Sequence, residues 1–204
     1  MPAVAPTPSV APPAPLADAA ARPSRWVWTR ERYDRLVQAG VLTPDDRVEL
    51  LDGDIIQKMP QKSPHATAVS LTSEALRVVA GPGAHVRTQL PLALSDVSEP
   101  EPDVAIVTGG LRAYTDRHPG PDEVLLSVEV SDTTLMLDRT AKEAANASAG
   151  VGEYWIVNLR DRQLEVYRDP AGEAYRTKTT HGPDEAVAPV ARPDARVSVA
   201  DLLP

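Results

Sequence analysis

The sequence lacks cysteine and phenylalanine, and only 4% of its 204 residues are aromatic. Without cysteine, disulfides, thiolate nucleophiles and zinc–thiolate sites are excluded. No run of roughly 18 apolar residues occurs, so the sequence predicts no membrane span. The N-terminus has no basic segment, and Pro12, Pro13 and Asp18 interrupt the only apolar stretch that follows, so we expect no secretory signal and a cytoplasmic protein.

The first 23 residues differ in composition from the rest of the chain. Fifteen of these 23 residues are proline or alanine, and only Asp18 and Arg22 are charged. Such a segment cannot bury enough apolar surface to offset the entropy lost on ordering. We therefore expect residues 1–24 to form a disordered tail and residues 25–204 to form one domain of ordinary size.

Basic residues are fewer than acidic ones, 21 against 29, which gives a net charge of -8. This balance argues against a protein that holds nucleic acid by bulk charge alone. It leaves open a protein that uses a metal ion at a local site. Lysine is especially scarce, with 4 residues against 17 arginines, so a surface cation in this chain would usually be arginine.

Local patterns predict helices and strands in alternation. A helix is expected after Thr29 and before Gly40, and Asp52-Gly53 between two apolar runs predicts a β-hairpin. A second helix is capped by Ser63, has Pro64 at its first position and ends near residue 81. The remaining segments predict strands, with a peripheral hairpin as the last pair: 84–94, 102–107, 124–131, 153–157, and then 164–167 with 174–180.

Residues 124–157 predict a strand, a helix and a second strand. In the first strand, alternate residues from Val124 to Val130 are apolar, whereas Glu129 and Ser131 point to the other face. The helix, over residues 137–149, is long enough for a crossover between parallel strands. This order of elements implies an α/β or α+β fold with a mixed sheet flanked by helices. No glycine-rich phosphate loop occurs in the sequence.

Two carboxylates stand at unusual places in this pattern. Asp103 follows Pro102 at the start of an apolar strand, where an aspartate satisfied by backbone or water is the ordinary explanation. Glu129 lies between Val128 and Val130. A carboxylate at such a position needs a charged partner, a metal ion, or a strand whose polar face meets solvent.

Lys142 is the third candidate. Asp138 lies four residues earlier, so an exposed helical ion pair is the simpler interpretation. The alternative is a compact ammonium that reaches a reacting centre. Taken together, two carboxylates on neighbouring strands and a lysine from the next helix would form one site. There the carboxylates could hold Mg²⁺ while the lysine orients water or stabilises charge on a phosphoryl group.

Glu49 and His65 complete the set of candidates. Glu49 could add a metal ligand from the hairpin, or it could belong to a solvated acidic face. His65 lies in the first turn of a helix, where amide donors gather, and could contact a phosphate or simply be exposed. The other histidines have no ligand spacing, so a histidine zinc site is unsupported: His85, His118 and His181.

Several stretches of the sequence resemble the Uma-two family, restriction-endonuclease-like proteins of the PD-(D/E)xK nuclease superfamily. The resemblance covers residues 26–204 and implies a restriction-endonuclease-like core, Mg²⁺ as cofactor with Mn²⁺ as a substitute, and DNA as substrate. The stretches that carry it are VELLDGDIIQKMPQKSPH, EPEPDVAIV, LLSVEVSDTTLMLDRTAKEAANASAGVGEYWIVN and VSVADLLP.

By the pattern of this family, Asp103 is the acid of the PD half-motif and Glu129 is the second acid. The superfamily's lysine usually stands two residues after that acid, where this chain has Ser131. The resemblance implies that the lysine has moved to the following helix and is Lys142.

Further positions match the family less directly. Glu49 and His65 match positions that are typically acidic and histidine, and Asp138 is expected to position the lysine. The chain departs from the family at Asn146, where tyrosine is usual, and at Asn158, where aspartate is usual. Neither residue is an expected metal ligand, but the first departure leaves substrate shaping near the lysine open.

The sequence therefore predicts a Mg²⁺-dependent endonuclease that hydrolyses DNA phosphodiester bonds. Its metal ligands would be Asp103, Glu129 and Glu49, with Lys142 as a further catalytic residue and His65 in contact with substrate. The alternative is a catalytically inactive nucleic-acid-binding or protein-interaction module that retains the fold. Because cutting both strands of a duplex favours two sites, a homodimer is compatible with the sequence, although no residue marks an interface.

Overall fold

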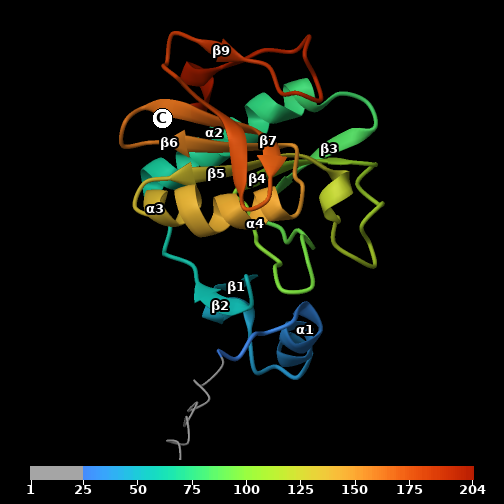
Figure 1. The fold of residues 1–204 in the computed structure, drawn as a ribbon. Coiled ribbons are helices and arrows are strands. Elements are labelled where there is room, and N and C mark those ends of the chain that lie inside the picture. The colour runs from blue at the N-terminus through green and yellow to red at the C-terminus, as the bar shows by residue number, and fades with distance from the viewer. Residues whose placement is uncertain (1–24) are drawn as a thin grey trace, which may run out of the picture.

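The computed structural model describes residues 25–204; residues 1–24, for which the sequence predicts a disordered tail, lie outside the described residues. At its centre is a six-stranded sheet with helices on both faces (Figure 1). This arrangement confirms the predicted fold class. In sheet order the strands are β3 (Ala84–Thr88), β4 (Val104–Thr108), β5 (Val124–Ser131), β6 (Glu153–Asn158), β7 (Gln163–Ala171) and β8 (Ala174–His181).

Strands β5 and β6 form the parallel pair of this sheet, and its other neighbouring strands are antiparallel. Parallel neighbours require a crossover, and the chain makes one of helical segments, as the sequence predicts. These are α3 (Leu135–Leu137), a π-helical turn (Asp138–Lys142) and α4 (Glu143–Ser148). The expectation of one regular helix over residues 137–149 is wrong, because the π-helical turn interrupts it.

Helix α2 (Ser63–Ala80) covers one face of the sheet. Its buried Leu76 and Val79 belong to the main hydrophobic cluster together with Val128, Val130 and Trp155 from the central strands. The alternation predicted for β5 is confirmed from Leu126 to Val130, whose apolar side chains join this cluster, whereas Val124 belongs to a separate cluster. Glu129 is left on the opposite face, toward the crossover.

Tyrosines fill the core on the crossover side of the sheet. Tyr154, Tyr167 and Tyr175 cluster with ring centroids 5.6–6.3 Å apart and pack against Ala147 of α4. A buried phenol needs a hydrogen-bond acceptor. Each hydroxyl has one, and that of Tyr154 donates to the carbonyl of Asp138 at 3.0 Å. In a protein without phenylalanine, aromatic packing therefore also anchors the π-helical turn.

The N-terminal part of the described chain forms a small unit at one end of the molecule (Figure 1). Helix α1 (Arg30–Gln38) is capped by Thr29, and β1 (Val48–Leu51) pairs with β2 (Asp54–Gln57) around the predicted Asp52-Gly53 turn. Both turn residues have positive φ, 48° and 75°, as a two-residue hairpin loop requires. The hairpin docks through the amide of Glu99, which donates to the carbonyl of Leu50.

Some predicted boundaries differ from the structure. Lys62, not Ser63, is the N-cap of α2, so the helix begins one residue earlier than expected. Strand β3 ends at Thr88 rather than at residue 94 because Gln89 adopts a left-handed conformation with φ 52°. The predicted hairpin of β7 and β8 is present as one edge of the main sheet. A separate C-terminal sheet follows, of β9 (Ala186–Val187) and β10 (Val197–Ser198), before a 3-10 helix over Val199–Leu202.

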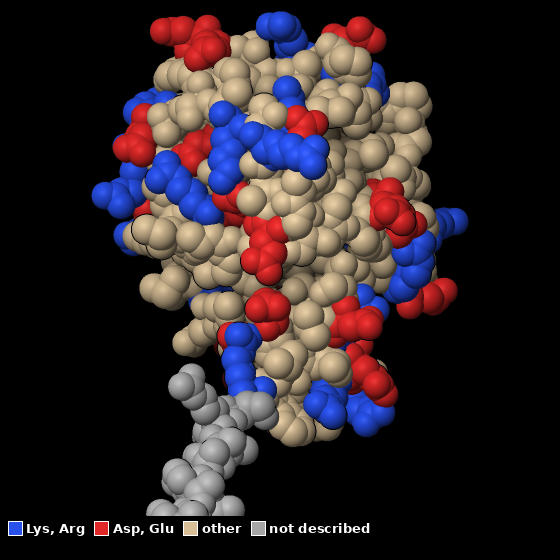
Figure 2. Space-filling model, in the orientation of Figure 1, with Lys and Arg blue, Asp and Glu red and all other residues tan. Residues whose placement is uncertain are grey.

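On the face seen in Figure 2, uncharged residues cover much of the surface, and both basic and acidic side chains are present. Of the helices within residues 25–204, none combines the length and apolar character needed to cross a bilayer.

Candidate active site

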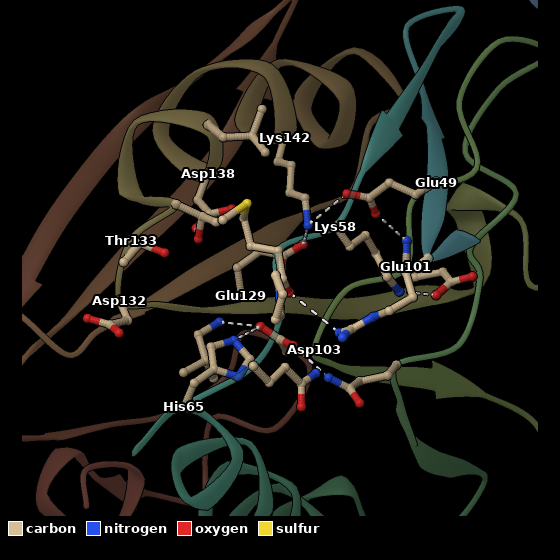
Figure 3. A pocket seen from close by; sticks show the side chains of 18 of the residues that line it. Glu49, Lys58, His65, Glu101, Asp103, Glu129, Asp132, Thr133, Asp138 and Lys142 are labelled. Carbon is tan, nitrogen blue, oxygen red and sulfur yellow. Dashed lines mark hydrogen bonds and ion pairs between the residues drawn. The ribbon is translucent and has the colours of Figure 1, made fainter. Parts of the chain in front are cut away.

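A pocket of about 100 Å³ opens where β5 ends and the crossover begins (Figure 3). The hairpin, the segment that joins β2 to α2, and the residue that precedes β4 form its other walls. All five site residues predicted from the sequence line this pocket, although they come from segments far apart in the chain: Glu49, His65, Asp103, Glu129 and Lys142.

Asp103 and Glu129 are brought together by the register of the sheet. Asp103 precedes Val104, which pairs with Val128, and Glu129 follows Val128 on the antiparallel neighbour. Opposed positions on antiparallel strands place Cβ atoms about 5 Å apart on one face. The Oδ2 atom of Asp103 also accepts a hydrogen bond from the amide of Val130 at 2.9 Å. The two predicted acids therefore lie side by side.

Glu49 is fully inside the pocket, and the alternative of a solvated hairpin face is wrong. It lies in β1, where Glu49 Oε2 accepts a hydrogen bond from the amide of Glu101 at 2.9 Å. Because Glu101 is two residues from Asp103, this bond holds the hairpin against the strand that carries the first acid. The hairpin thus delivers a third carboxylate to the site.

Lys142 lies between two of these carboxylates (Figure 3). Its Nζ atom is 2.9 Å from Glu129 Oε1 and 3.3 Å from Glu49 Oε1. All three residues are buried, with exposed fractions of 7% for Lys142, 4% for Glu129 and 2% for Glu49. The interpretation of Lys142 as part of an exposed helical pair is therefore wrong, as is that of Glu129 as a solvent-facing residue of an edge strand.

The charges of this group fix its protonation. Burial alone would lower the pKa of Lys142, but the carboxylates of Glu129 and Glu49 outweigh that effect and raise the pKa above its usual value. Lys142 is therefore an ammonium. Burial raises the pKa of Glu129 well above its usual value, and the nearby acids add to this increase while Lys142 opposes it.

Asp103 is held by a separate set of hydrogen bonds. Its Oδ1 atom accepts from Gln89 Nε2 at 3.1 Å, and His65 Nε2 lies 3.2 Å from Oδ2. Burial would raise the pKa of Asp103, but the bonds from His65, Val130 and Gln89 hold it below its usual value. The same contact raises the pKa of His65 against the effect of burial. His65 is not simply exposed, and its buried Nδ1 atom has no partner within the described residues.

Asp138 and Lys142 stand at the two ends of the π-helical turn. The Asp138 side chain is buried and accepts a hydrogen bond from Thr134 Oγ1 at 2.7 Å, while its carbonyl receives the hydroxyl of Tyr154. Burial raises the pKa of Asp138, which Lys142 opposes. A single π-helical turn inside a longer helix is a frequent feature of functional sites. Here it turns the Lys142 side chain toward the sheet.

The residues at which the chain departs from the family lie beside the pocket but do not line it. Asn146 Nδ2 donates to the carbonyl of Lys142 at 2.9 Å, and Asn158 donates to Asp161 and Glu165. Ser131, at the usual position of the superfamily's lysine, is fully buried and its Oγ has no partner within the described residues. The ammonium therefore reaches the site from the helix and not from β5.

Sequence reasoning missed the basic side of the pocket. Lys58 and Lys62 line it together with Lys142, so three of the four lysines in the chain lie at one site. Lys58 pairs with Glu101, and Lys62 Nζ lies 3.5 Å from Asp132 Oδ2. The scarcity of lysine was the signal that could have found them. No sequence signal marked Gln89 or Asp132. Gln89 reaches the pocket through a left-handed backbone conformation, and Asp132 reaches it because it follows the end of β5.

The chemistry of the pocket suits Mg²⁺. Within residues 25–204, no three histidine, aspartate or glutamate side chains already surround one point as a metal cage. Mg²⁺, however, keeps several waters and usually takes only one or two protein carboxylates. Asp103 and Glu129 offer such a pair, and Glu49 lies on the far side of the Lys142 ammonium. The donor set is therefore compatible with a hard divalent ion.

Comparisons with known proteins agree with this picture. A search of the curated proteins finds no match. A solved structure described as "a putative nuclease belonging to DUF820 from Anabaena variabilis ATCC 29413" is similar in fold, with a TM-score of 0.65 and 17% identity over 85% of this chain and 96% of that one. The model of the Uma2 family, described as "Putative restriction endonuclease", matches residues 30–200, and the chain therefore belongs to that family.

Proposed function

We propose that this protein is a Mg²⁺-dependent endonuclease that hydrolyses DNA phosphodiester bonds. The observation that carries the proposal is the buried group of Glu49, Glu129 and Lys142 beside Asp103, assembled from segments that are remote in sequence. Burying several like charges is unfavourable, and a purely structural core has no need of it. Membership of a family of restriction-endonuclease-like proteins supports the same conclusion.

In this proposal Asp103 and Glu129 hold the metal ion, and Glu49 supports it from the hairpin. When bound, Mg²⁺ supplies charge stabilisation on the phosphoryl oxygens and lowers the pKa of a coordinated water. Gln89 and the Val130 amide fix the Asp103 carboxylate, so that its orientation does not have to be gained at each turnover.

Lys142 has the complementary role at the phosphate. Because its pKa is raised it cannot act as a base, but its ammonium can donate hydrogen bonds to a phosphoryl oxygen whose charge grows in the transition state. His65 lines the same pocket and is held by Asp103 through Nε2, so that its ring can contact the substrate beside that acid.

The test is cleavage of plasmid and linear DNA with Mg²⁺ or Mn²⁺. Glu129→Gln and Lys142→Ala are each expected to lower kcat at least a hundredfold, as loss of a group that stabilises the transition state typically does. Glu143→Gln is the matched control, because Glu143 is equally buried on the same crossover but pairs with Lys178 outside the pocket. Equal activity in all variants would refute the assignment.

One observation favours the alternative of an inactive module that retains the fold. The Lys142 ammonium already lies against two carboxylates, as it would if no metal were ever bound. Calorimetric titration separates the two functions: a nuclease binds Mg²⁺ or Mn²⁺ and loses that binding in Glu129→Gln, whereas an inactive module gives no heat with either ion.

A further inference from the structure

A second depression, of about 430 Å³, adjoins the candidate active site. The two share one wall, which lies between the hairpin and the start of β4. The residues common to both are Arg47, Lys58, Gln61, Gln89 and Glu101. A ligand in the first pocket therefore has to extend only across these residues to reach the second.

The sizes of the two cavities suit different parts of one substrate. The first is the smaller, at about 100 Å³, and suits a metal ion and a phosphate group. The second, at about 430 Å³, falls within the range of about 300–1,000 Å³ that is typical of pockets for small organic ligands.

The shared wall contains two residues with unusual backbones. Arg47 and Gln89 have φ values of 49° and 52°, in the left-handed region that side chains other than glycine rarely adopt. Such conformations persist where the surroundings enforce them and often mark functional sites. Here the Arg47 carbonyl accepts a hydrogen bond from the amide of Lys58 at 2.7 Å, which ties the start of the hairpin to its end.

Arg47 also has an available charge. Its side chain is exposed, its Nη2 atom reaches only the carbonyl of Met59 at 3.5 Å, and it forms no ion pair within residues 25–204. The other basic group of the shared wall, Lys58, is paired with Glu101. A guanidinium in this state suits a phosphate, which it can bind with two parallel hydrogen bonds.

The far wall of the second depression is apolar. Val37 of α1, Leu42 and Pro44 line it, together with the largely buried ring of Tyr33. Val37 is 48% exposed, although it is a large apolar side chain on a helix of an otherwise polar character. The second depression therefore has an apolar wall on one side, and an arginine with two glutamine amides on the other. These groups are chemically complementary to the base and the phosphate of a nucleotide.

We propose that the second depression is the subsite for the nucleotide next to the scissile phosphate of a single-stranded nucleic acid. Arg47 binds the phosphate of that nucleotide, and the base lies against Val37, Leu42 and Pro44. Because a base held in a pocket cannot remain paired, the site selects strands that are single or locally unpaired. This inference rests on the proposed nuclease function for its scissile phosphate.

The first test is binding, which does not depend on cleavage. Fluorescence anisotropy with a labelled DNA oligonucleotide of about 12 nucleotides in EDTA gives the affinity over a series of salt concentrations. Arg47→Asn removes the charge but tolerates the left-handed backbone. We expect it to weaken binding about tenfold and to reduce the salt slope by about 0.7, the effect of one phosphate contact to a single strand.

Arg162→Asn is the matched control. Arg162 is also exposed and left-handed, with φ 51°, but it lies in the turn between β6 and β7, where Nη1 donates to the carbonyl of Pro204. The affinity of Arg162→Asn for the oligonucleotide, and the dependence of that affinity on salt, are expected to equal those of the wild type. Equal salt slopes for the Arg47 and Arg162 variants would overturn the phosphate assignment.

The second test concerns the base. Val37→Ser removes apolar contact without adding charge and is expected to weaken single-strand binding about fourfold, the value of roughly one methylene group. Val78→Ser is the control, since Val78 is 84% exposed on α2 and lines neither depression. An oligonucleotide made of abasic sites is expected to bind wild type and Val37→Ser alike. A loss that persists with the abasic strand would overturn the base assignment.

Cleavage then separates this inference from the function on which it rests. Activity of the wild type on methyl p-nitrophenyl phosphate, a diester without a nucleoside, tests the catalytic site alone. If Arg47→Asn lowers kcat/KM on single-stranded DNA about tenfold more than on the diester, the subsite is supported. If it lowers kcat/KM on both substrates equally or on neither, the subsite is wrong while the nuclease stands. If the wild type cleaves neither substrate, the nuclease is wrong and the binding assays alone decide the subsite.

Discussion

Replacing Lys142 by methionine should strongly destabilise the protein in the absence of metal. Methionine keeps most of the volume of the side chain, so the main change is the loss of a buried ammonium between Glu129 and Glu49. Breaking a buried ion pair on one side typically costs about 3–5 kcal/mol, because the remaining charge is left without compensation. In a domain of this size, that corresponds to a decrease in Tm of about 10 °C.

A divalent ion should reverse part of this loss. In Lys142→Met, Mg²⁺ held by Asp103 and Glu129 would supply positive charge that Glu129 has lost, whereas in the wild type the ammonium already supplies it. A ligand at 100 times its Kd adds about 2.7 kcal/mol. We therefore expect Mg²⁺ to raise the Tm of the variant by more than that of the wild type, in thermal unfolding followed by circular dichroism with and without the ion.

Lys178→Met is the comparison for this prediction. Lys178 also pairs with a buried glutamate, Glu143, at 2.8 Å, but half of its side chain is exposed, so that water can replace it. The cost should be about 1 kcal/mol or less and independent of Mg²⁺. The reasoning is refuted if Lys142→Met costs no more than Lys178→Met, or if Mg²⁺ shifts the Tm of both variants and the wild type equally.

Other predictions concern the parts that support the site. Burial raises the pKa of Glu99 to about 7, above its unfolded value, so its ionisation destabilises the fold as pH rises through this range. Between pH 5 and pH 8, the free energy of unfolding of Glu99→Gln should therefore rise by about 1–3 kcal/mol relative to that of the wild type, as measured by urea unfolding. A difference that does not change with pH would contradict this. Tyr154→Phe removes a buried hydroxyl that donates to the π-helical turn. It should lower the free energy of unfolding in urea by about 1–2 kcal/mol and should lower kcat severalfold. Unchanged activity would show that this bond does not orient the turn. Gly53→Ala combines a φ of 75° with a Cβ that would clash with Val27 Cγ1, and should lower the free energy of unfolding by about 1–3 kcal/mol, as measured by thermal unfolding. This is more than for Gly172→Ala, where the φ is similar but no atom lies within 4 Å of the added Cβ.

The central part of the site was predictable because it depends on alternation along strands. Glu129 interrupts an apolar run on the face opposite Val128 and Val130, and Asp103 precedes the strand that pairs with it. Period-two patterns determine which side chains share a face, and short local signals fixed the Asp52-Gly53 hairpin. The mixed sheet with a helical crossover could be predicted on the same grounds.

The rest of the site depends on contacts between remote residues. The side-chain direction of Lys142 follows from a π-helical turn that is tied to Tyr154, and no local pattern in residues 137–149 distinguishes this turn from a regular helix. The left-handed conformations of Arg47 and Gln89 likewise depend on how the hairpin meets the start of β4. Neither residue type favours such a conformation, so sequence gave no reason to expect the shared wall.

The docking of the hairpin onto the sheet also bears on when the protein can become active during synthesis. From Glu49 to Lys142 the site extends over nearly half of the chain, and the parallel pairing of β5 with β6 forms only after the crossover has emerged from the ribosome. Pairings so distant in sequence form late and cooperatively. A nascent or partly unfolded chain would therefore have neither the complete carboxylate group nor its lysine, and hydrolytic activity should disappear in the same transition as the native fold.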